Sequence, residues 1–346
     1  MNCARMLLIV AGLACVLVTR GTLGQTASPD LYRISGTVAL GAPDRWDYLQ
    51  YEPSTHRIYA AHSTSIDVLD SATGAKIAQV PVPGANGVVV VPDIGKGYAG
   101  SRTNQSLVVF DSKTFKVLKS VPVGEDTDAV VYDSASKRVF VMEGDPHKAV
   151  AVDTATDTVA GEVMLAGQPE FAAVDAAGKL FVNIADKRAI QRIDTHTLKV
   201  EATWPVAECE SPHGLSIDPA SKRLFSTCIN SKLLVVDATS GRIVATFPIG
   251  QGSDASAFDE RRKRIFSSNG AGSLTIIRAD TPDKYTLLGE NVTQPLARTM
   301  ALDSQTGRIY LLSGDRIEVD PKATNPHKRY GVAPGSARLL MLDPVP

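Results

Sequence analysis

Seven polar residues recur along the chain, each just before or at the start of a short apolar run. Their side chains include carboxylates, an imidazole and a guanidinium, which are groups that can take part in catalysis or binding. The seven residues are Asp47, Asn86, Asp128, Glu170, His213, Asp254 and Arg298. A second set follows the next apolar run of each repeat and consists of His62, Arg102, Glu143, Asp186 and Asn269, together with Cys228 and Asp315. Carboxylates gathered with histidine could transfer protons or hold a cation, provided that the fold brings them together.

The repeat that must position these residues is clearest at residues 213–250, HGLSIDPASKRLFSTCINSKLLVVDATSGRIVATFPIG. Four short apolar runs alternate there with turns rich in Asp, Ser, Gly and Asn. None of the runs is long enough for an ordinary helix. The pattern predicts a four-stranded antiparallel meander.

Two markers repeat in phase seven times. An aspartate ends each third strand, and successive aspartates are 41 to 43 residues apart except for the last pair, which is 63 apart: Asp70, Asp111, Asp153, Asp194, Asp237, Asp280 and Asp343. Each second strand begins with a basic residue that an aromatic residue follows two positions later, as in Arg57 and Tyr59. A period near 42 with four strands per repeat predicts an all-β, seven-bladed β-propeller that spans residues 31–346.

The two ends of the chain are expected to share one blade. Residues 32–41, YRISGTVALG, resemble a fourth strand with no first three strands before them, whereas the last repeat stops after its third strand. Pairing the two would close the ring and remove an open sheet edge. Residues 313–336 form an insertion in the last repeat and are predicted to be a long surface loop.

In such a propeller, the links between blades and the turns from second to third strands share one face, here called the top face. The remaining hairpin turns share the bottom face. Both polar sets then fall on the top face, and the first would ring the mouth of the central channel. Glu143 of the second set is also expected at this mouth, where Glu143, Glu170 and His213 are the leading candidates for function. A ring of ionisable groups at one mouth predicts a binding or catalytic site on that face.

Residues 1–24 have the features of a secretory signal peptide, with Arg5 ahead of an apolar stretch that is too short to span a membrane. We therefore expect a periplasmic or secreted protein; a buried N-terminal helix and a lipoprotein anchor at Cys15 are the alternatives. Removing this segment, which also holds Arg20, leaves 34 basic and 37 acidic residues, a net charge near −3. So nearly neutral a chain offers no general attraction to nucleic acid.

Two of the four cysteines, Cys209 and Cys228, remain after removal of the signal peptide. Both map to the same end of the fifth repeat. In an oxidising compartment we expect them to form a disulfide rather than to stay as free thiols.

The sequence leaves the chemistry of the top face open. His62 or His213 with Glu143 or Glu170 could hold a divalent metal, but no HExxH or paired CxxC spacing is present, so no cofactor is predicted. No nucleophile elbow or P-loop is present either. The first hypothesis is a monomeric, non-enzymatic protein that binds an unknown small molecule or protein at this face. The second is an enzyme of the lactonase or lyase type with His213 as an acid–base group.

The repeat resembles the bacterial YVTN-repeat propellers, the YncE-like family. The matching segments are LFVN at 180–183, LVVD at 234–237 and PVG at 122–124. A secreted subgroup is especially similar through CESPHG at 209–214, SSNG at 267–270 and ART at 297–299. The resemblance implies an exported seven-bladed propeller and does not imply one activity.

Overall fold

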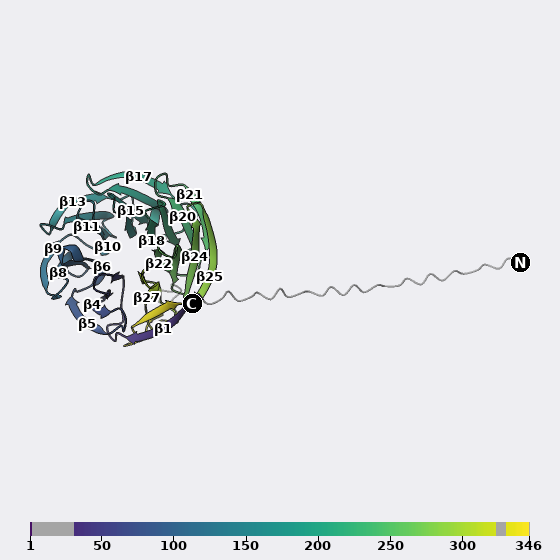
Figure 1. Ribbon diagram of the computed structural model, residues 1–346, viewed down its shortest axis with the longest axis horizontal. Helices are drawn as coiled ribbons and strands as arrows, with labels where there is room; N and C mark the ends of the chain where they lie inside the picture. The colour runs from purple at the N-terminus through teal and green to yellow at the C-terminus, as the bar shows by residue number, and fades with distance from the viewer. Residues whose placement is uncertain (2–30, 323–329, 346) are drawn as a thin grey trace.

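The computed structural model describes Met1, residues 31–322 and residues 330–345. The predicted signal peptide, residues 1–24, therefore lies outside the described residues apart from Met1. Seven four-stranded antiparallel sheets are arranged around one centre, as Figure 1 shows, so the predicted seven-bladed propeller is confirmed. The described residues contain no helix with the length and apolar character that crossing a membrane requires.

Six blades take their strands in chain order, from the centre outward. Blade one consists of β2 (Leu49–Glu52), β3 (Arg57–His62), β4 (Ser65–Asp70) and β5 (Lys76–Pro81). Blade two consists of β6 (Ala85–Val91), β7 (Lys96–Ser101), β8 (Ser106–Asp111) and β9 (Val117–Pro122). Blade three consists of β10 (Thr127–Asp133), β11 (Arg138–Glu143), β12 (Lys148–Asp153) and β13 (Thr158–Met164). Blade four consists of β14 (Pro169–Val174), β15 (Lys179–Ile184), β16 (Ala189–Asp194) and β17 (Lys199–Pro205). Blade five consists of β18 (Pro212–Asp218), β19 (Arg223–Cys228), β20 (Lys232–Asp237) and β21 (Ile243–Pro248). Blade six consists of β22 (Ser253–Asp259), β23 (Arg264–Asn269), β24 (Ser273–Thr281) and β25 (Lys284–Val292). Two single-turn 3₁₀ segments interrupt the loops, η1 (Pro92–Ile94) and η2 (Ala185–Lys187).

Blade seven joins the two ends of the chain, as predicted. Its strands run outward in the order β26 (Met300–Asp303), β27 (Arg308–Ser313), β30 (Arg338–Pro344) and β1 (Tyr32–Ala39). β1 is antiparallel to β30, with Tyr32 opposite Pro344 and Ala39 opposite Arg338. The N-terminal strand thus covers the edge that the last repeat would otherwise expose.

The insertion in blade seven contains a short two-stranded sheet. Two of its segments, β28 (Arg316–Glu318) and β29 (Tyr330–Val332), pair as an antiparallel hairpin on the top face. The intervening residues 323–329, which include His327, lie outside the described residues. Within the predicted surface loop, Arg316 thus lies opposite Val332 and Glu318 opposite Tyr330.

The aromatic marker of each second strand forms the core between blades. These seven side chains are at most 2% exposed: Tyr59, Tyr98, Phe140, Phe181, Phe225, Phe266 and Tyr310. Burying one large ring per blade supplies much of the apolar area that holds neighbouring blades together.

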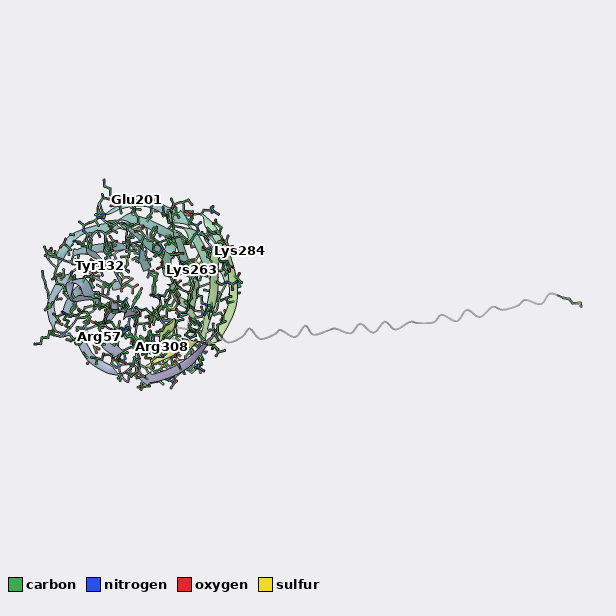
Figure 2. The ribbon with its side chains drawn as sticks, viewed as in Figure 1. Arg57, Tyr132, Glu201, Lys263, Lys284 and Arg308 are labelled. Atoms are coloured by element: carbon green, nitrogen blue, oxygen red, sulfur yellow. A yellow bond between two sulfur atoms is a disulfide. The ribbon has the colours of Figure 1, made fainter. Side chains whose placement is uncertain are left out.

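The basic marker links neighbouring blades at the bottom face. Arg138 in blade three donates to the carbonyls of Thr195 and His196 in the outer turn of blade four, at 2.8 and 3.0 Å. Arg308 in blade seven reaches the turn of blade one in the same way, and Figure 2 labels Arg308 and Arg57 in these adjoining blades. The markers of five blades make such a contact with a backbone carbonyl of the next blade: Arg57, Lys96, Arg138, Arg223 and Arg308. Lys179 of blade four instead pairs with Asp194 and Glu201 of its own blade.

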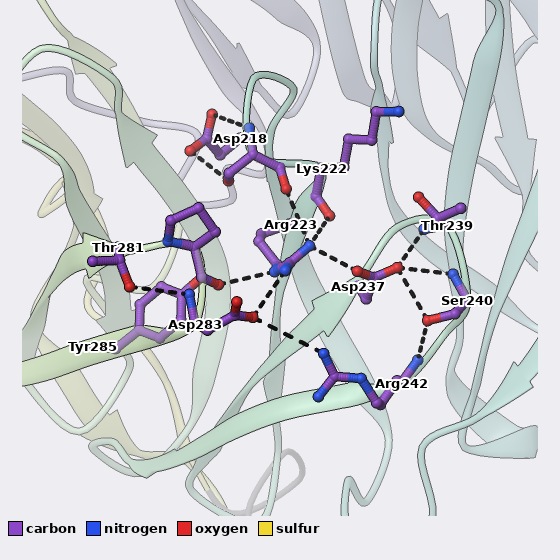
Figure 3. A network of polar contacts seen from close by, with 12 residues as sticks. Asp218, Lys222, Arg223, Asp237, Thr239, Ser240, Arg242, Thr281, Asp283 and Tyr285 are labelled. Carbon is purple, nitrogen blue, oxygen red and sulfur yellow. Dashed lines mark hydrogen bonds and ion pairs between the residues drawn. The ribbon is translucent and has the colours of Figure 1, made fainter.

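Figure 3 shows the most extensive of these contacts, around Arg223. Its guanidinium pairs with Asp237 of its own blade at 2.7 Å and with Asp283 of blade six at 3.0 Å. The aspartate marker has its own role, because Asp237 accepts the backbone N–H groups of Thr239 and Ser240 and so closes the turn.

The aspartate markers of blades one to four close their turns in the same way: Asp70, Asp111, Asp153 and Asp194. Asp280 departs from the pattern. β24 continues one residue beyond it, and its carboxylate accepts from Arg278 and Thr286 instead.

Candidate functional site

The first predicted set of polar residues lies around the centre of the top face. One residue comes from each blade, at or just before the start of the innermost strand: Asp47, Asn86, Asp128, Glu170, His213, Asp254 and Arg298. We call this set the mouth ring. The innermost strands of neighbouring blades pack on one another, as β6 does on β10 and β18 does on β22, which places these starting positions close together.

Direct contacts join the members of the mouth ring in pairs. Arg298 Nε lies 3.2 Å from Asp254 Oδ2, and Asn86 Nδ2 donates to Asp128 Oδ1 at 3.2 Å. On the other side, His213 Nε2 is 3.9 Å from Glu170 Oε1, which is beyond hydrogen-bond distance. The ring therefore contains four carboxylates, of which only Asp254 is closely paired with a guanidinium within the ring.

The carboxylates of the mouth ring hold protons more tightly than isolated carboxylates do. Burial, followed by the charge of Asp254, raises the pKa of Asp47 to about 7. Burial, followed by the charges of Asp47 and Glu170, raises the pKa of Asp128 well above its usual value. Burial also raises the pKa of Glu170, although the neighbouring His213 opposes this rise. Burial and the mutual repulsion of neighbouring carboxylates thus both raise the pKa values of these groups, and the nearby cations oppose the rise only in part.

Two aromatic side chains close the channel beneath the mouth ring. Tyr48 of blade one and Phe171 of blade four meet with ring centroids 4.5 Å apart, and Tyr48 donates to Asp128 Oδ2 at 3.3 Å. Below them is a cavity of about 280 Å³ lined mainly by apolar residues of the innermost strands, such as Val88 and Ala129. Polar side chains are fewer there than at the mouth, and they include Gln50 in the cavity wall and the Ser216–Ser256 pair of the innermost strands.

One ring nitrogen of the mouth-ring histidine is hydrogen-bonded to the backbone. His213 Nδ1 lies 2.9 Å from the carbonyl of Ser211, which can only accept a hydrogen bond, so Nδ1 carries the proton. In the neutral ring, Nε2 then presents a lone pair toward Glu170. This arrangement allows proton exchange through a bound water or ligand, without a direct contact between the two side chains.

Three members of the second predicted set do not reach the channel mouth. His62, Glu143 and Asn269 are the last residues of the second strands β3, β11 and β23, and each is at most 1% exposed. The expected place of Glu143 at the mouth is corrected, because its side chain is fully buried and is not presented to the channel opening. His62 Nδ1 contacts Asp67 Oδ2 at 2.9 Å, and Glu143 Oε2 lies 3.5 Å from Lys148 Nζ. Burial raises the pKa of Glu143.

Two further members of the second set, Arg102 and Asp186, lie on the top face. Arg102 Nε is 2.8 Å from Asp126 Oδ1, and its charge partly opposes the rise in the pKa values of Asp47 and Asp128. Asp186 is used structurally, because its Oδ1 accepts the backbone N–H of Gln168 at 2.7 Å in the link into blade four. Of the two, only Arg102 acts on the mouth ring.

The link into blade five is fixed covalently. Cys209 and Cys228 form a disulfide with a Cα–Cα distance of 5.2 Å, as the sequence predicts. Both residues are fully buried. The bond ties the start of the link to the end of β19, and so anchors the segment that presents His213 to the mouth.

A second, larger cavity of about 540 Å³ opens on the top face between blades six, seven and one. We call it the rim pocket. Its wall consists of Asp44, Arg45, Trp46, Gln251, Gly252, Gly270, Ala271, Leu296, Arg298, Arg316, Tyr330, Gly331 and Val332. Arg298 is the one residue of the mouth ring in this wall. Sequence reasoning missed the other residues, although the insertion in the last repeat pointed to this side of the face.

Among the described residues, no three His, Cys, Asp or Glu side chains are grouped so that they could hold a metal ion.

Comparisons with known proteins agree with the architecture. Hydrazine synthase from Kuenenia stuttgartiensis has a similar structure, with a TM-score of 0.69 over 81% of this chain and 95% of that chain, at 13% sequence identity. The chain has the seven-bladed propeller fold. At this identity the likeness extends to the fold alone. No protein-family model matches the chain, and no curated protein matches it.

Proposed function

We propose that this propeller is an exported, non-enzymatic binding protein that holds a small molecule at its top face. The observation that carries the proposal is the position of Arg298, which belongs both to the mouth ring and to the wall of the rim pocket. A pocket of about 540 Å³ falls within the usual range for small-ligand sites. The mouth ring and the rim pocket together offer charged groups of both signs beside an apolar wall.

Two features support export. A buried disulfide between Cys209 and Cys228 is typical of proteins that fold in an oxidising compartment. The first 24 residues have the sequence features of a signal peptide, and the resemblance to YVTN-repeat propellers points in the same direction. Fractionation of cells that produce the full chain tests this: a periplasmic or extracellular product beginning near residue 25 is expected, and an uncleaved cytoplasmic product would contradict export.

The binding role is tested by a thermal-shift screen of the mature chain against a panel of amino acids, organic acids, amines and sugars. The screen is repeated with Glu170→Gln, Arg298→Gln and the bottom-face variants His56→Ala and His196→Ala. We expect compounds that raise the melting temperature of the parent to lose their effect in at least one top-face variant and to keep it in both bottom-face variants. Loss in the bottom-face variants alone would place the site on the opposite face.

A further inference from the structure

The rim pocket has a wall that other blades of this propeller lack. Only blade seven carries an insertion between its second and third strands, and the hairpin β28–β29 from that insertion supplies Arg316, Tyr330 and Val332 to the pocket. The opposite wall comes from the segment before β2, including Arg45 and Trp46. Chain segments almost 300 residues apart thus converge on one cavity.

The charge of the rim pocket is predominantly positive. Arg45, Arg298 and Arg316 line it, and within the described residues neither Arg45 nor Arg316 lies within ion-pair distance of a carboxylate. The charge of Arg45 nevertheless acts on Asp47, where it opposes the rise in pKa. The one acidic residue of the wall, Asp44, is engaged elsewhere, because its oxygens accept the backbone N–H groups of Gly335 and Ala337 at 2.6 and 3.1 Å. Two guanidinium groups are left to bind an anion.

Much of the remaining wall is apolar or aromatic. Trp46, Tyr330, Val332 and Leu296 line the cavity, and the guanidinium of Arg316 stacks over the ring of Tyr330 at 4.6 Å. Gly314 keeps this wall close-packed, since a Cβ there would lie 2.7 Å from Val332 Cγ1 and 2.9 Å from Trp46 Cη2. Such a wall suits a planar ring, because aromatic faces and stacked guanidinium groups both favour flat partners.

We propose that the rim pocket binds a small organic anion with a planar apolar body, of the aromatic carboxylate class. This assignment rests on the proposed binding role of the top face and names the ligand class for it. Arg45 and Arg316 hold the carboxylate, for which guanidinium groups provide paired donors. Trp46 and Tyr330 contact the ring system, and Arg298 connects the pocket to the mouth ring through Asp254.

Isothermal titration of the mature chain with 2-naphthoate and with 2-naphthamide tests the assignment, because the two probes share a ring system and differ in charge. We expect the carboxylate to bind at least about tenfold more tightly than the amide. Arg45→Gln and Arg316→Gln should each weaken naphthoate binding by roughly fivefold to tenfold and change naphthamide binding less than about twofold. Both arginines are exposed, so these variants should melt like the parent.

The matched control is Arg261→Gln, an exposed arginine in the bottom-face turn between β22 and β23, which should leave both affinities unchanged. Equal affinity for naphthoate and naphthamide would overturn the anion assignment while leaving the top-face proposal intact. Inorganic phosphate that competes as strongly as naphthoate would overturn the planar-body requirement. Naphthoate binding that only Arg261→Gln abolishes would overturn both proposals.

Discussion

Arg298 Nε lies 3.2 Å from Asp254 Oδ2 at the border between the mouth ring and the rim pocket. The pair divides the top face into two electrostatic parts. On the channel side, carboxylates outnumber guanidinium groups and the pKa of Asp47 is raised to about 7. On the rim side, two arginines lack a carboxylate partner within the described residues. A ligand that contacts both parts would have its channel-side end near carboxylates and its rim-side end near arginines.

The raised pKa of Asp47 predicts a specific dependence of stability on pH. An unfolded aspartate titrates near pH 4, so between about pH 4 and 7 the folded state binds more protons than the unfolded state. Stability therefore falls as the pH rises through this window. Asp47→Asn should remove the fall and raise the free energy of unfolding at pH 8 by on the order of 2 kcal/mol, with little change at pH 4. Urea unfolding at the two pH values measures this difference, with the exposed Asp145→Asn as control. If Asp47→Asn changed the free energy of unfolding equally at both pH values, the account would be contradicted.

The disulfide should contribute to stability by restricting the unfolded chain. Cys209 and Cys228 lie 19 positions apart in the sequence, and for a loop of this length loop closure predicts a stabilisation of about 3 kcal/mol. Cys228→Ser with Cys209→Ser should lower the free energy of unfolding by roughly that amount, as chemical denaturation would show. Mass spectrometry of unreduced peptides checks the bond itself: two alkylatable thiols in the exported protein would refute it.

Removing the N-terminal strand should expose the edge of β30. Deletion of residues 31–41 takes away the whole of β1, including Tyr32, whose side chain is buried against Phe266. We expect a lower melting temperature or aggregation, because an unpaired edge and an uncovered core residue remain. A chain that begins at residue 25 is the control. If the deletion variant melts like this control, the ring does not depend on β1.

The inter-blade contact of the basic marker should be measurable at Arg138. Arg138→Gln removes a charged donor from the carbonyls of Thr195 and His196 and should destabilise the fold by about 1–3 kcal/mol. Arg261→Gln, an exposed arginine in a turn, should change stability by less than about 0.5 kcal/mol. Thermal or urea unfolding compares the two; equal effects would mean that the conserved spacing of the marker has another cause within the repeat.

Sequence reasoning predicted the blades and the ring closure because each repeat carries markers with a physical role. The aromatic marker fills the space between blades, the basic marker holds the neighbouring turn, and the aspartate closes its own turn. The missing first three strands before residue 32 then required the two ends of the chain to share a blade. The mouth ring followed from the same periodicity, since one position per repeat begins the innermost strand.

The same reasoning failed where side-chain direction or distant segments decide the outcome. Glu143 sits at the right end of its strand but points between sheets, where it neighbours Lys148. We therefore expect Glu143→Ala to lower stability rather than to act on binding alone. The rim pocket was missed because Arg45, Trp46 and Arg316 come from unrelated segments and form no motif. Only the unusual length of the last repeat indicated extra structure there.

The most direct test of the binding role is hydrogen–deuterium exchange of the mature chain, with and without the tightest-binding compound from the thermal-shift screen. The account predicts slower exchange in top-face segments around residues 44–47, 251–254 and 296–298 and in the hairpin β28–β29, with the bottom-face turns at 54–56 and 219–222 unchanged. Slower exchange confined to those bottom-face turns would contradict it.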